Sequence, residues 1–98
     1  MTPDNNGYRE PIRQLHDHLA AVQERPVDRM ANRWIGEAES VVADIVGEDL
    51  EHHVFQKRLS HVEELLDHVE ELDDSAASDH LAEAKRSTAD LLDRLEDD

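Results

Sequence analysis

The stretch VFQKRLSHVEELLDHVEEL, residues 54–72, decides the fold class that the sequence predicts. Its apolar residues recur at steps of four and three, which places one set on a single helical face: Phe55, Leu59, Val62, Leu66 and Val69. Polar and charged residues fill the positions between them, so only that face can be buried. The pattern predicts a helix over residues 50–72, capped by Asp49, that must pack against other helices.

Three further segments carry the same amphipathic spacing and predict helices over residues 8–25, 27–46 and 76–95. The first has its stripe at Ile12, Leu15, Leu19 and Val22, and the last has its stripe at Leu81, Ala84, Thr88, Leu91 and Leu95. Nothing in the sequence alternates as a half-buried strand does. Four such helices joined by short turns predict an all-α, antiparallel up-down-up-down four-helix bundle. A three-helix core with the first segment loosely docked, or a helical dimer, is the alternative. We expect residues 8–98 to form one domain, after a disordered tail over residues 1–7.

Turn-forming residues set the predicted helix limits. Pro26 ends the first helix and Asp28 can cap the second, while Gly47 is expected to end it in a left-handed turn. Ser75 or Ser78 can cap the last helix. The second helix has a broad apolar stripe, widened further by Ile35 and Val46. The stripe consists of these residues: Val27, Met30, Ala31, Trp34, Ala38, Val41, Val42 and Ile45.

The net charge of −15 is the most unusual property of the chain. Residues 48–98 hold seventeen acids and five bases, a net of −12, and only two of the ten bases are lysines. This excess of carboxylates predicts a protein adapted to a salt-rich cytoplasm, because salt screens the self-repulsion. The same charge argues against nucleic acid as a partner, since phosphate binding needs clustered Lys and Arg.

The sequence shows no signal for a membrane span, for secretion or for the common catalytic motifs. There is no run of 18 apolar residues for a membrane span and no basic, then apolar, signal peptide at the start. The absence of Cys excludes disulfides and thiolate chemistry, and we expect a cytoplasmic protein. No serine lies in a Gly-x-Ser-x-Gly motif, and three glycines cannot build a phosphate-binding loop.

Seven histidines raise the question of a metal site. His61, Glu64 and His68 share one helical face and form the one candidate ligand set for a divalent metal. The competing interpretation is that they are solvated residues beside the buried face. The carboxylates that follow Ser60 are interpreted as a solvated acidic surface, since helical metal enzymes need further acid pairs on a neighbouring helix.

Arg25, Arg29 and Arg33 stand at steps of four and form the one basic stripe of the chain. Such a stripe can contact an anion or the acidic segment of a partner. The alternative is a set of intramolecular ion pairs with the acids of the third and fourth helices.

Residues 12–95, and above all the piece NRWIGEAE at residues 32–39, resemble the small acidic helical proteins of unknown function found in haloarchaea. The resemblance implies a helical fold, a cytoplasmic location and a high-salt habitat, and it implies no activity.

The sequence therefore favours a non-enzymatic module that acts by association, with a protein partner or as a homo-oligomer. Four amphipathic stripes are present, whereas no catalytic constellation and no cofactor motif is. The alternative function is metal binding or metal-dependent catalysis through His61, Glu64 and His68 or the neighbouring acids.

Overall fold

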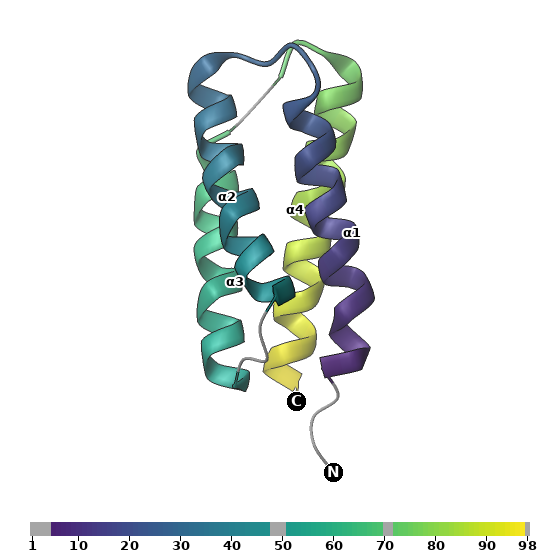
Figure 1. Cartoon of the computed structure of the whole chain (residues 1–98), viewed down its shortest axis with the longest axis vertical. Coiled ribbons are helices and arrows are strands. Elements are labelled where there is room, and N and C mark those ends of the chain that lie inside the picture. The colour runs from purple at the N-terminus through teal and green to yellow at the C-terminus, as the bar shows by residue number, and fades with distance from the viewer. Residues whose placement is uncertain (1–4, 48–50, 70–71, 98) are drawn as a thin grey trace.

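A computed structural model describes residues 5–47, 51–69 and 72–97 of the chain, and these form a four-helix bundle (Figure 1). The helices are α1 (Asn5–Gln23), α2 (Arg29–Gly47), α3 (His52–Asp67) and α4 (Ser75–Asp97). Each helix packs against the next one in the chain, and α4 returns to pack against α1. The described ranges contain no strand, so the predicted all-α bundle is confirmed.

One apolar core runs through the bundle and contains side chains from all four helices. Leu15, Leu66 and Leu91 are each at most 1% exposed. At one end of the core the rings of Tyr8 and Phe55 meet edge to face, with centroids 5.4 Å apart. Thr88 is the one buried polar residue of the described part, and its hydroxyl donates to the carbonyl oxygen of Ala84 at 2.8 Å. The predicted stripes of α1, α3 and α4 are therefore core residues.

Helix α2 is rotated relative to the prediction, because its predicted stripe was too broad to be buried whole. Ile35, Ala38, Val42 and Ile45 are buried. Met30 is 59% exposed. The other residues of the predicted stripe are half-buried at the edges of the core: Val27, Ala31, Trp34 and Val41.

Several helix limits differ from the prediction. Helix α1 begins at Asn5, inside the predicted tail, and residues 1–4 lie outside the described residues. Helix α3 ends at Asp67 rather than at residue 72, with His68 as its C-cap. Gly47 is the last residue of α2 and has no positive φ, so the left-handed ending predicted there was wrong.

The helix caps are partly as predicted. Asp28 caps α2, since its carboxylate accepts the Ala31 N–H at 3.4 Å. Asp49 lies outside the described residues, and the N-cap of α3 is Glu51, which makes no side-chain cap hydrogen bond. Helix α4 is capped by Asp74 rather than by a serine: its Oδ2 accepts the Ala77 N–H at 2.9 Å. A carboxylate at this position also complements the positive end of the helix dipole.

Candidate interaction surface

Trp34 and His68 stack on each other at the outer edge between α2 and α3. Their ring centroids lie 4.1 Å apart and their planes differ by 12°. Trp34 is half-buried and packs against the core, whereas His68, just after the end of α3, is exposed. The sequence predicted Trp34 as a core residue. In the structure Trp34 is only half-buried, and the exposed imidazole of His68 lies against its ring, so the indole forms part of the protein surface.

Met30 lies one helical turn before Trp34 on the same flank of α2, and Val41 lies two turns after it. Met30 is the most exposed large apolar side chain of the described residues, at 59%. We refer to Met30, Trp34, Val41 and His68 together as the Met30 surface. A contiguous patch of exposed and half-buried apolar side chains is typical of an interaction site. Spacing alone does not identify this surface, because the same spacing also fits a buried stripe.

The charges of α2 are separated along its axis. Arg29 and Arg33 lie in its first two turns, and the acids Glu37, Glu39 and Asp44 follow them toward its C-terminal end. Apart from the Asp28 cap that precedes it, its first turn holds no acid, and its last turn holds no base. This order opposes the helix dipole, which favours acids at the start of a helix and bases at its end. The charge pattern of α2 is therefore not explained by the stability of the helix itself.

Two ion pairs bear on this charge pattern. Arg33 Nε lies 3.8 Å from Glu37 Oε1 on the same helix, and both side chains are about half or more exposed. Arg58 Nη1 of α3 lies 4.0 Å from Asp44 Oδ2. Pairs so long and exposed contribute little stability, about 0–1 kcal/mol each. Both carboxylates and both guanidinium groups remain accessible to further partners.

Arg25 is separated from the predicted basic stripe, because it lies in the turn between α1 and α2 and not on a helix. Its Nε and Nη2 donate to Oδ2 and Oδ1 of Asp74 at 2.9 and 3.1 Å. These hydrogen bonds, together with that from the Ala77 N–H, lower the pKa of Asp74, and the pair raises the pKa of Arg25. Arg25 thus joins the turn after α1 to the start of α4, and only Arg29 and Arg33 remain beside the Met30 surface.

The predicted metal ligands do not assemble into a site. His61, Glu64 and His68 are exposed on α3 or just after it, and His68 stacks on Trp34. In the described parts of the chain, no group of three or more His, Asp or Glu residues is placed to hold one metal ion. Residues 70 and 71 of the predicted acidic run lie outside the described ranges.

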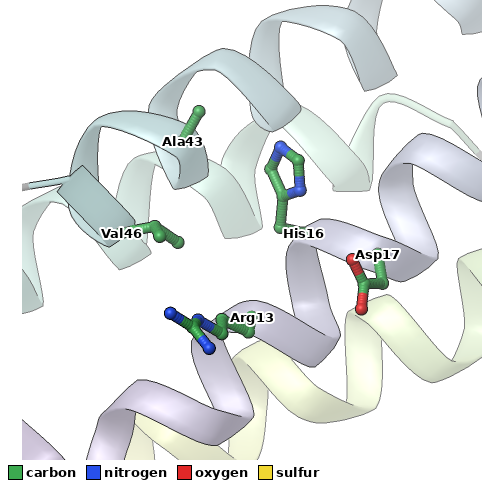
Figure 2. Close-up of a pocket in the computed structure, with 5 residues that line it drawn as sticks. All are labelled: Arg13, His16, Asp17, Ala43 and Val46. Atoms are coloured by element: carbon green, nitrogen blue, oxygen red, sulfur yellow. The ribbon is translucent and has the colours of Figure 1, made fainter.

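A shallow pocket of about 420 Å³ lies on the other flank of α2, against α1. The pocket is lined by Arg13, His16 and Asp17 of α1 and by Ala43 and Val46 of α2, and Figure 2 shows His16 extending from α1 toward α2. His16 Nε2 also lies 4.0 Å from Oε2 of Glu39 on α2. Arg13, His16 and Asp17 are the polar residues of the lining, and neither a nucleophile–base pair nor a ligand set is present among the lining residues.

These features define a class: a small four-helix domain with an exposed apolar flank on one helix. None of the helices in the described ranges is long and apolar enough to cross a membrane. Residues 11–98 match the family described as a domain of unknown function (DUF8152), and the chain belongs to that family. No curated protein and no solved structure matches the chain.

Proposed function

We propose that the protein is a non-enzymatic helical module that acts by self-association, with the Met30 surface as the contact between two copies. The observation that carries the proposal is Met30, 59% exposed beside the Trp34–His68 stack. Complete burial of a fully exposed side chain of this size contributes about 1.5–3 kcal/mol, which is the upper limit for Met30 in an interface. Aromatic residues and Met are also enriched where protein interfaces are buried most completely.

The charge pattern of α2 favours a second copy of this chain as the occupant. Two copies related by a two-fold axis present the same surface to each other. If their α2 helices run antiparallel, the basic half with Arg29 and Arg33 lies opposite the acidic half of the other copy. The opposed helix dipoles then also attract. This pairing explains a charge order that is unfavourable within one isolated helix.

We also propose that the protein works in a salt-rich cytoplasm. The support is its net charge of −15 with only two lysines, together with its resemblance to acidic helical proteins of haloarchaea. At such salt, charge steering between copies is screened beyond about 3 Å, so the apolar contact supplies most of the association free energy.

The test is sedimentation equilibrium of the full chain in multimolar potassium chloride. We expect a dimer for the natural chain and a monomer for Met30→Gln, which removes the exposed apolar contact without adding charge. Val46→Gln is the matched control, because Val46 is also exposed on α2, at 42%, but lies on the opposite flank. It should remain dimeric.

Charge reversal tests the orientation of the two copies. At the lowest salt concentration at which the natural chain stays folded, where these charges are screened least, Arg33→Glu should weaken the dimer. The added change Asp44→Arg should restore part of the affinity by re-creating the opposite-charge pair. A strictly monomeric natural chain at high protein concentration would exclude self-association. A Met30→Gln variant that dimerises like the natural chain would exclude the Met30 surface. If the chain forms a complex only when a different protein is present, that protein is the partner and self-association is excluded.

A further inference from the structure

His18 on α1 and His80 on α4 form a close pair across the interface between these two helices. They are 62 positions apart in the chain, yet their Nδ1 atoms lie 3.3 Å from each other. The ring centroids are 5.6 Å apart with planes at 41°, so the rings are not stacked. The closest approach is nitrogen to nitrogen, and the pair is half-buried.

Two neutral imidazoles can use this contact in only one way. One Nδ1 must carry a proton and donate it, while the other Nδ1 must be bare. A divalent metal ion makes a different use of the same two atoms, because it accepts the lone pairs of both nitrogens at once. Both rings then carry their proton on Nε2.

The distance between the two Nδ1 atoms matches coordination of one metal ion by both nitrogens. Zinc binds histidine nitrogen at about 2.0–2.1 Å with tetrahedral angles, so two of its nitrogen ligands lie about 3.3–3.4 Å apart. Ligands at right angles, as in square-planar copper sites, would lie closer, at about 2.8–3.0 Å. The observed 3.3 Å fits the tetrahedral case.

We propose that His18 and His80 form a two-histidine site for a divalent transition metal, zinc being the ion that the geometry fits. The site would join α1, the first helix of the chain, to α4, the last. It is separate from the His61, Glu64 and His68 set and does not depend on self-association. With two protein ligands, the remaining coordination positions are open to water or to an external ligand.

The surrounding structure holds both rings in place. Each histidine is followed at once by a buried leucine: Leu19 is 0% exposed and Leu81 is 3% exposed. The backbone at both positions is therefore anchored by the core, and ligands on helices are held more firmly than ligands on loops. The net charge of −15 also raises the local concentration of cations.

The sequence contained a weak signal for this pair. His18 lies three residues after Leu15 and four before Val22, so it flanks the buried stripe of α1. His80 lies four residues before the buried Ala84 of α4. Inspection of spacing within one helix cannot find such a site, because its two ligands belong to different helices.

The experiment adds zinc chloride to the full chain after chelator treatment and dialysis, in a buffer without phosphate. Calorimetric titration measures stoichiometry and affinity, and urea unfolding measures stability. We expect one zinc ion per chain. Free zinc at about one hundred times the dissociation constant should raise the folding equilibrium constant about 100-fold.

His18→Gln and His80→Gln should each abolish this stabilisation. His16→Gln is the matched control, because His16 is on the same helix and has a 35% exposed side chain but contacts Glu39 instead. It should respond to zinc like the natural chain. Nitrogen NMR of the imidazoles gives an independent readout in the natural chain: Nδ1 of both His18 and His80 should shift on zinc binding, with Nε2 protonated.

Three results would overturn the proposal: no zinc effect on the natural chain, a zinc effect that survives either substitution, or one zinc ion shared by two chains. If a variant does not fold, the NMR of the natural chain decides alone. Unshifted Nδ1 signals of His18 and His80 at saturating zinc would then reject the site.

Discussion

Leu66→Ala tests whether the helical stripes meet in one core. Leu66 is 1% exposed and is the last buried residue of α3, one position before the helix ends. The substitution removes three carbon groups, each worth about 0.8 kcal/mol of transfer free energy, or about 2.4 kcal/mol together. The cavity left behind adds to this, so the free energy of unfolding should fall by about 2–5 kcal/mol. Domains of this size are stable by about 5–15 kcal/mol, so the loss is a large share.

Urea unfolding at constant high salt measures the loss, with an unchanged slope showing that the compactness of the two states is unchanged. Leu92→Ala is the control, because it makes the same chemical deletion at a half-buried position on α4. It should cost less than half as much. A loss below about 0.5 kcal/mol for Leu66→Ala, or an equal loss for both variants, would show that the face of α3 with Leu66 is not in the core.

Three further predictions concern backbone, charge and salt. Gly36→Ala should stabilise the protein by about 0.5–1 kcal/mol, because the added Cβ meets only Gln23 Oε1, at 3.6 Å; a destabilised variant in urea unfolding would contradict this. Asp74→Asn should destabilise the fold at neutral pH and progressively less in acid. The pKa of Asp74 is lowered by Arg25, so its contribution is present above the ordinary Asp pKa and is lost as the pH falls through the folded value; an equal loss at every pH would refute it. The melting temperature should rise steeply as potassium chloride is added, whereas a flat profile would count against salt adaptation.

The fold was largely predictable because the stripes of α1, α3 and α4 are narrow. Leu15, Leu66 and Leu91 each stand in a stripe that leaves one choice of buried face. Helix α2 shows the limit of this reasoning. Its apolar residues cover so wide an arc that the sequence cannot say which edge faces the core, and the structure exposes the edge with Met30.

The prediction of a serine as the N-cap of α4 was wrong for a related reason. Asp74, Ser75 and Ser78 are all good N-cap residues, and the position of Arg25 in space favours the carboxylate. Candidate sites were predicted less well than the fold, because they depend on contacts between helices. The stack of Trp34 on His68 brings together residues from two elements, which the spacing along one helix does not show.

Four helices bury one shared core, and nuclear Overhauser spectroscopy tests this arrangement most directly. The chain has one Tyr, one Trp and one Phe, so their aromatic signals cannot be confused with one another. Tyr8 of α1 and Phe55 of α3 belong to helices that are not neighbours in the bundle, yet their rings lie 5.4 Å apart. The structure predicts a strong cross-peak between these two rings. A well-dispersed spectrum of the folded protein without that cross-peak would contradict the shared core.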